Sequence, residues 1–147
     1  MTVAKTVIPL SAIFMLAFMR QRVTRLAASG QNSTKNGKTT IVAENMRYFA
    51  IVASNKFKVS HTYADGIRIN NYYFAGKNSK QYNKLALLTA KDNFNIFTKK
   101  IGKYPYKEID MTEGLLSKDT GGMEYPSLIR IDASGFVQKK HLSLIHI

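Results

Sequence analysis

Residues 78–102 read NSKQYNKLALLTAKDNFNIFTKKIG, and this stretch decides the fold class of the chain. Five apolar residues in it recur at spacings of three and four, which places them on one face of a helix: Leu87, Ala90, Phe94, Phe97 and Ile101. Asn78 is a suitable N-cap, with Gln81 three residues later as in a capping box. Gly102 suits the position after a helix, and Pro105 prevents continuation. We therefore predict a helix over residues 78–101 with this apolar face packed on a core.

The segments on both sides of this helix have the patterns of strands. The continuous apolar run Phe49–Ala53 predicts a strand buried on both faces. Further strands are predicted at residues 57–60, 67–74, 107–112 and 127–132, with a turn at Asp65-Gly66. Residues 29–40, SGQNSTKNGKTT, predict a loop or the tip of a hairpin. Strands, one long helix and then more strands predict an α+β fold.

Composition narrows the possible functions. The chain has 147 residues, no Cys, and 22 Lys and Arg against 9 Asp and Glu, giving a formal net charge of +13. The lack of Cys excludes disulfides, Cys-ligated zinc, iron–sulfur clusters and a thiol nucleophile. The charge favours a nucleic-acid or anionic-membrane partner, and a small basic binding module is our alternative interpretation. The basic residues are mostly Lys and are spread along the chain, so we expect neither nucleic acid nor membrane as a partner.

No familiar catalytic motif is present. The histidines His61, His141 and His146 do not form H-E-x-x-H, and the chain has no nucleophile elbow and no phosphate-binding Walker loop. The scattered acidic residues do not form a pair with assignable acid and base roles. Composition and spacing alone therefore indicate no more than an α+β protein.

Three segments carry a more specific signal. They are AENMRYFA at residues 43–50, YPYKEID at residues 104–110 and GGMEYP at residues 121–126. In this order they resemble the M1 family of zinc metallopeptidases, the aminopeptidase N-like gluzincins, and the resemblance covers about residues 27–137. Tyr48 stands where the family usually has Asp, and Tyr125 where it more often has Asn.

The resemblance implies a fold and a domain division. Residues 27–58 would be the end of an N-terminal β-domain. Residues 59–141 would open a thermolysin-like catalytic domain, with strands, one long helix and an edge strand.

It also implies a function, the hydrolysis of N-terminal residues from peptides, and a set of substrate-binding residues. These are Gly121, Gly122, Met123 and Glu124. The Glu124 carboxylate would bind the α-ammonium group of a peptide, because an opposite charge makes a strong hydrogen-bond partner. The backbone of the other three would align the peptide as an added strand.

Zinc is the cofactor that the resemblance implies for the full-length parent. In the family, H-E-x-x-H and a later Glu bind the metal downstream of this strand. This chain ends before such a motif, so we expect it to contain no catalytic residue, to bind no metal and to be inactive alone.

Both ends of the sequence carry separate expectations. Residues 142–147, LSLIHI, match the translation of a transposon-end sequencing adapter, and we expect the gene to have been cut at His141, so that only residues up to His141 are genuine. Near the start, Val7–Met19 is uncharged and shorter than the ~20 residues that span a membrane. It could be a signal-peptide core, an organellar presequence, a buried strand or an artefactual start. The resemblance favours the artefactual or incomplete start for residues 1–26.

Overall fold

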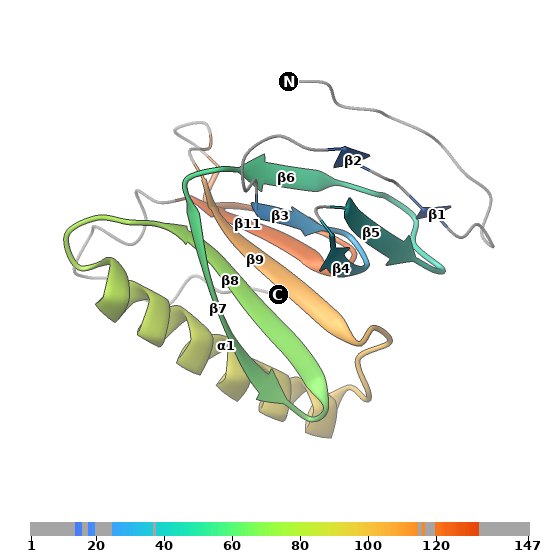
Figure 1. Ribbon diagram of the computed structural model, residues 1–147. Helices are drawn as coiled ribbons and strands as arrows, with labels where there is room; N and C mark the ends of the chain where they lie inside the picture. Colours follow the sequence, from blue (N-terminus) through green and yellow to red (C-terminus); the bar gives the residue numbers. More distant parts are fainter. Residues whose placement is uncertain are drawn as a thin grey trace.

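The computed structural model describes residues 14–15, 18–19, 25–36, 38–114, 116 and 120–132. The predicted α+β class is confirmed: the described residues form mostly strands, with one helix, α1 (Ser79–Lys100) (Figure 1). The expectation about residues 142–147 concerns a part of the chain outside the described residues. No helix in the described ranges is long and apolar enough to cross a membrane.

The centre of the fold is a five-stranded mixed sheet in the order β10-β11-β9-β8-β7. Its strands are β7 (Phe57–Ala64), β8 (Ile67–Phe74), β9 (Glu108–Gly114), β10 (Gly122–Tyr125) and β11 (Leu128–Asp132). The three inner strands β8, β9 and β11 run parallel, whereas β7 and β10 pair antiparallel at the two sides. The helix α1 is the crossover between β8 and β9, since parallel neighbours need a long connection.

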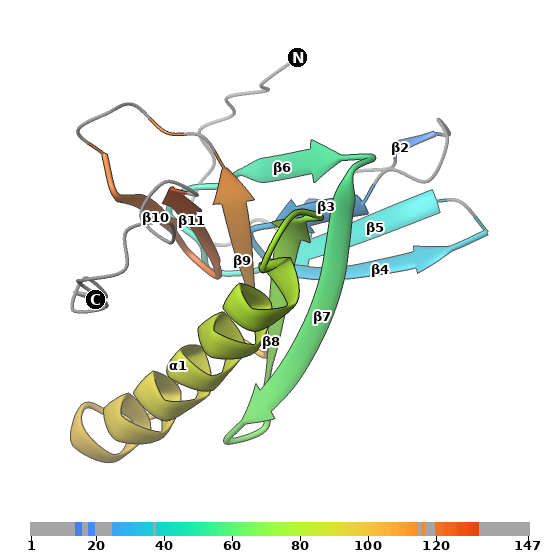
Figure 2. The same ribbon diagram turned by 90° about the vertical axis from the view of Figure 1, so that its left-hand side faces the viewer.

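The N-terminal strands form a second layer. Its elements are β1 (Phe14–Met15), β2 (Phe18–Met19), β3 (Arg25–Ala28), β4 (Gln31–Lys35), β5 (Lys38–Ala43) and β6 (Ile51–Ser54). β3 pairs with β6, while β1, β2 and β4 pair with β5, all antiparallel. β3 and β6 lie on the face of the mixed sheet opposite α1 (Figure 2). Of the apolar run Val7–Met19, only the two short strands β1 and β2 are described.

Two cores lie on the two faces of the mixed sheet. On the α1 face, Ala90, Leu87 and Phe94 pack against buried residues of β7, β8 and β9. On the other face, Ala27 of β3 packs with Phe57, Tyr72 and Leu128. The predicted apolar face of the helix is thus confirmed for these three residues. It is wrong for Ile101, which is 80% exposed because it lies beyond the last turn of α1.

Turn and cap predictions have mixed outcomes. Asp65 and Gly66 both have positive φ, 49° and 76°, as a two-residue hairpin between β7 and β8 requires. Gly102, with φ 128°, ends α1 as predicted, and its N–H donates to the Phe97 carbonyl at 3.3 Å. Asn78 occupies the N-cap position, but its φ is 68° and its side chain makes no capping bond. The capping-box prediction is therefore wrong, because side-chain capping needs an extended backbone at that position.

The predicted hairpin tip at residues 29–40 and the predicted buried strand at Phe49–Ala53 can also be compared with the structure. A hairpin tip lies within residues 29–40, where Asn36 takes a φ of 52° between β4 and β5, but residues 31–35 and 38–40 form strands rather than a loop. The run Phe49–Ala53 is not a strand buried on both faces. β6 begins at Ile51 and is only partly buried, since it belongs to a two-stranded ribbon rather than to the interior of a sheet. The division at residue 58 stays a prediction, and β7 runs through that position.

Candidate functional site

The predicted substrate-binding residues lie on and beside β10, which is at one edge of the mixed sheet in the described part of the chain. Side chains of a strand point alternately to its two faces. Tyr125 packs into the core beside β3 and β6, and Ile129, the partner of Glu124, packs into the core beside α1. Gly122 and Glu124 therefore lie on the α1 face, whereas Met123 and Tyr125 lie on the opposite face. The structure brings the four predicted residues together but divides them between two faces.

The backbone of β10 presents polar groups at the side of the sheet. The Gly121 carbonyl accepts a hydrogen bond from the Asp132 N–H at 3.1 Å, so Gly121 bonds inward to β11. In an antiparallel pair, inward and outward bonding alternate from one residue to the next. The N–H and C=O groups of Gly122 and Glu124 therefore point away from β11, in the geometry that an added strand would use.

The two glycines of this segment differ in what they require. A Cβ built on Gly122 would lie 3.2 Å from Glu124 Oε1 and 3.3 Å from the Arg130 carbonyl oxygen. A side chain at Gly122 would thus crowd the carboxylate. A Cβ on Gly121 would meet nothing within 4 Å, so the fold does not require that glycine sterically. Glu124 is exposed, and its carboxylate lies over the backbone of Gly122.

The turn between β10 and β11 is fixed by Ser127. This residue is 3% exposed and has a φ of 54°, a left-handed conformation that costs a residue with a Cβ of order 1–3 kcal/mol. Its Oγ accepts the Gly30 N–H at 2.7 Å, and its carbonyl accepts the Asp110 N–H at 2.9 Å. The turn that leads into the predicted site is therefore held by both layers of the fold.

Asp110 lies behind this turn and is 0% exposed. Its carboxylate accepts hydrogen bonds from the Ala28 N–H at 3.0 Å, from Asn32 Nδ2 at 3.0 Å and from Asn70 Nδ2 at 2.8 Å. The same Asn32 nitrogen lies 3.0 Å from Glu108 Oε1. These buried bonds attach β3 and β4 to the mixed sheet, because their partners come from both layers.

Burial changes the acidity of this cluster. It raises the pKa of Asp110 to about 7, against the opposing effect of the Asn70 and Ala28 hydrogen bonds. Burial also raises the pKa of Glu108, partly offset by Asn32, Arg68 and Asn70. It is likewise the main reason that the pKa values of the Tyr72 and Tyr104 hydroxyls lie above their usual range. Of these groups only Arg68 carries a positive charge, so the site disfavours two ionised carboxylates.

The three segments of the family resemblance meet around this cluster. Tyr104 packs edge-on against Phe94 of α1, with ring centroids 5.0 Å apart. The Tyr106 hydroxyl donates a long hydrogen bond of 3.4 Å to the Asn45 carbonyl. Asp110 in turn bonds to Ser127, next to the GGMEYP segment. In this chain, the residues of YPYKEID have packing and anchoring roles.

A cavity of about 180 Å³ opens on the α1 face of the sheet. It lies where α1 begins, and Ile131 of β11 and Glu113 of β9 line it together with Tyr73 and Tyr82. The Glu113 carboxylate accepts the Phe74 N–H at 2.8 Å, which holds the end of β8. Because Ile131 is the cross-strand partner of Gly122, the cavity shares its face of the sheet with Glu124.

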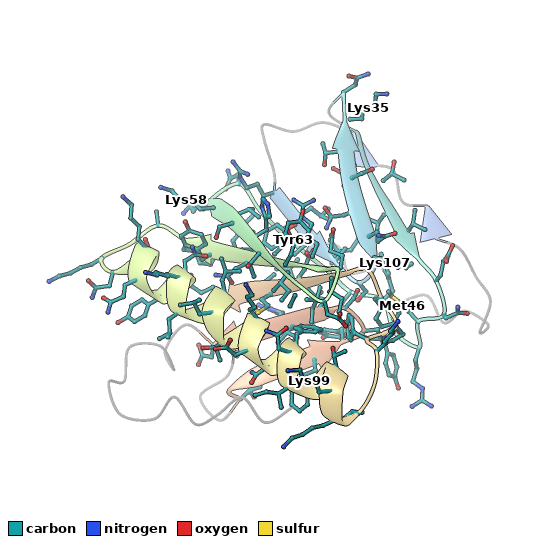
Figure 3. The ribbon with its side chains drawn as sticks, turned by 90° about the horizontal axis from the view of Figure 1, so that it is seen from below. Lys35, Met46, Lys58, Tyr63, Lys99 and Lys107 are labelled. Atoms are coloured by element: carbon teal, nitrogen blue, oxygen red, sulfur yellow. The ribbon has the colours of Figure 1, made fainter. Side chains whose placement is uncertain are left out.

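Two other kinds of site, a metal centre and a basic patch, can be compared with the described residues. No three His, Asp or Glu side chains among them come close enough to hold a metal ion. Basic side chains of the described residues come from several different elements. Figure 3 shows Lys35 at the tip of the β4–β5 hairpin, Lys58 on β7 and Lys99 near the end of α1.

Sequence reasoning missed the residues that hold the site. Asn32 and Gly30 lie in a segment predicted only as a loop or hairpin tip. Nothing local marks Asn32 as a partner of β9 or Gly30 as a partner of Ser127 in the β10–β11 turn. The stretch EIDMT at 108–112 does contain a sign of buried polar residues, because its polar residues alternate with Ile109 and Met111. If both faces of that strand are covered, its polar side chains must be buried and hydrogen-bonded.

Searches for similar proteins add no relative: no family model and no curated protein matches this chain.

Proposed function

We propose that this chain is part of an M1-type zinc aminopeptidase and carries the segment that binds the N-terminus of the peptide substrate. The observation that carries the proposal is the exposed Glu124 carboxylate on β10, the edge strand of the described sheet, beside the outward backbone groups of Gly122 and Glu124. A peptide N-terminus needs an anionic partner for its ammonium group and strand-like partners for its backbone. β10 offers both within three residues.

The local geometry supports this role for Glu124. Gly122 leaves room for the carboxylate to lie over the strand, where a Cβ would come within 3.2 Å of Glu124 Oε1. A peptide paired along β10 would place its first residue near this carboxylate. The nearby cavity of about 180 Å³ lies on the same face and is large enough for a side chain.

Tyr125, which stands where the family more often has Asn, does not alter this face. Its ring packs with Leu128, Tyr72 and Phe57 in the core on the opposite side of the sheet. The family resemblance at Glu124 can therefore hold even though the next residue differs.

The finer assignment of the fold belongs to the same proposal. The N-terminal layer would be the end of a β-domain, and the mixed sheet with α1 would open a thermolysin-like catalytic domain. The described residues do not fit a zinc site, since no three potential ligands come together. In the proposed parent enzyme, zinc and the water it activates would be held by the H-E-x-x-H motif and the later Glu that the family resemblance implies, and the described part of this chain would contribute substrate binding.

Peptide binding to the chain itself tests the proposal. We would titrate the tripeptide Leu-Gly-Gly and its N-acetylated form into the ¹⁵N-labelled protein and follow the amides of Met123, Glu124 and Tyr125. We expect the free amine to bind up to about fivefold more tightly than the acetylated form, because an ion pair at an exposed carboxylate contributes up to ~1 kcal/mol.

The variant Glu124→Gln should remove this preference, because it keeps the shape of the side chain and loses the charge. Glu44→Gln is the matched control, another exposed glutamate, which lies between β5 and β6, and it should behave as the natural chain does. Equal affinity for both peptides in the natural chain would contradict the proposal.

The source gene offers a second test. Sequencing the genomic locus beyond the codon for His141 should reveal H-E-x-x-H in frame. In that longer protein, Glu124→Ala should impair aminopeptidase turnover. If the reading frame instead ends without that motif, and the chain binds DNA or anionic vesicles in a salt-dependent manner that Lys84 and Lys91 control, the basic binding module is correct.

A further inference from the structure

Ser127 combines two features that rarely occur together. Its φ of 54° is a conformation that glycine or asparagine adopts more readily, and the turn Pro126-Ser127 joins β10 directly to β11. Yet its side chain is buried and hydrogen-bonded, with Oγ 2.7 Å from the Gly30 nitrogen. A strained residue persists only when its surroundings determine its conformation. The serine hydroxyl gives this turn a bond that glycine would not supply.

The residue at the other end of this bond is equally constrained. Gly30 has a φ of 112°, and a Cβ on it would lie 2.5 Å from the Val42 carbonyl oxygen. Next to it, the Ala28 N–H and the Asn32 side chain bond to Asp110. The β3–β4 connection is therefore rigid where it meets Ser127, and it can act as a fixed support for the β10–β11 turn.

We propose that Ser127 is a positioning residue for Glu124: its Oγ–Gly30 hydrogen bond fixes the β10–β11 hairpin against the N-terminal layer. The strand β10 has β11 as its only neighbour within the described part of the sheet. Its orientation therefore depends on the turn at Ser127 and on the pairing with β11. Glu124 lies three residues before Ser127, so a rotation of the turn would move the carboxylate and the outward groups of β10 together.

The importance of this position for peptide binding rests on the proposed function. The effect of the Ser127–Gly30 hydrogen bond on the β10–β11 hairpin does not. Amide hydrogen exchange in the 147-residue chain tests this effect directly. Two variants separate the hydrogen bond from the strain. Ser127→Ala loses the hydroxyl and keeps the strained conformation, and Ser127→Gly loses the hydroxyl and relieves the strain.

Ser54→Ala is the matched control. The Ser54 Oγ accepts the Lys56 N–H at 3.1 Å in an exposed turn, so this variant also removes one hydroxyl that accepts from a backbone N–H. In both Ser127 variants, we expect the Gly30 amide proton to shift and to exchange faster. The inward-bonded amides of Met123 and Tyr125 should exchange about fivefold faster, the factor that corresponds to one lost hydrogen bond of ~1 kcal/mol. Amides of the β7–β8 pair should keep their rates.

Ser127→Gly gives the decisive result, since the relief of strain offsets the cost of leaving the Gly30 N–H without its partner. Natural exchange rates at Met123 and Tyr125 in Ser127→Gly would overturn the positioning role. In the peptide titration, both Ser127 variants should reduce the preference for the free amine although Glu124 is intact. If the natural chain shows no such preference, the proposed function fails, and the exchange rates still decide whether Ser127 positions the hairpin.

Discussion

The buried carboxylate of Asp110 makes the stability of this fold depend on pH in an unusual direction. Its pKa is about 7 in the folded chain, against an ordinary value of 3.8. The folded chain therefore binds a proton more readily than the unfolded chain between these two values. Stability from this group is fully present below about pH 4 and is lost as the pH rises through about 7. The raised pKa of Glu108 acts in the same direction.

The magnitude follows from the separation of the two pKa values. A difference of about 3 pH units, at ~1.4 kcal/mol for each, gives an upper limit of about 4 kcal/mol. Asp110→Asn keeps the size of the side chain and has no charge to bury. Relative to this variant, the natural chain should therefore lose up to about 4 kcal/mol of unfolding free energy between pH 4 and pH 8.

Urea unfolding followed by far-ultraviolet circular dichroism at pH 4, 5.5, 7 and 8 measures this difference. Asp92→Asn on the exposed side of α1 is the control, and its pH profile should run parallel to that of the natural chain. Parallel profiles for Asp110→Asn and the natural chain would refute the reasoning. A natural chain that gains stability relative to the variant as the pH rises would also refute it, because the three N–H donors would then outweigh burial.

Two further predictions concern packing. Gly30→Ala should lower the free energy of unfolding by several kcal/mol, because its Cβ would lie 2.5 Å from the Val42 carbonyl oxygen; Gly66→Ala, with positive φ but open space around it, should cost only about 1 kcal/mol in the same urea titration. Leu128→Ala should cost about 2–5 kcal/mol because the side chain is 0% exposed, whereas Leu88→Ala on the exposed face of α1 should change the urea midpoint little. Equal effects within either pair would contradict the packing described above.

Patterns of neighbouring residues predicted the turns, the end of the helix and the strand whose structure depends on those same residues. The hairpin at Asp65-Gly66 and the end of α1 at Gly102 follow from backbone conformations that few residues adopt, so the residue types reveal them. The strand at residues 67–74 matches β8, because Ile67 and Ile69 alternate with polar residues and the segment ends in aromatic residues that favour strands. The edge strand with Glu124 came from the family resemblance rather than from any pattern in the chain.

The parts that could not be predicted depend on distant partners. Ser127 occupies a position that suits glycine, and only the bond to Gly30 accounts for it. Asn32 is one polar residue in a polar segment, yet it joins two buried acids 76 and 78 residues away. Ile101 continues the helical spacing but lies past the last turn, where the core has ended. No local window contains the information that decides these positions.

The long-range bonds between the layers also determine when the chain can fold during its synthesis. The Ala28 N–H can bond to Asp110 only after 82 further residues have been synthesised, and the Gly30 N–H can bond to Ser127 only after 97. At ~5–20 residues per second, a ribosome needs roughly 5–20 s to deliver those partners. Until then, β9 and β11 are missing from the sheet against which β3 and β6 pack, and the N–H groups of Ala28 and Gly30 lack their partners. The strands of the N-terminal layer are therefore synthesised before the mixed sheet, but their hydrogen bonds to it form only after β9 and the β10–β11 turn have been synthesised.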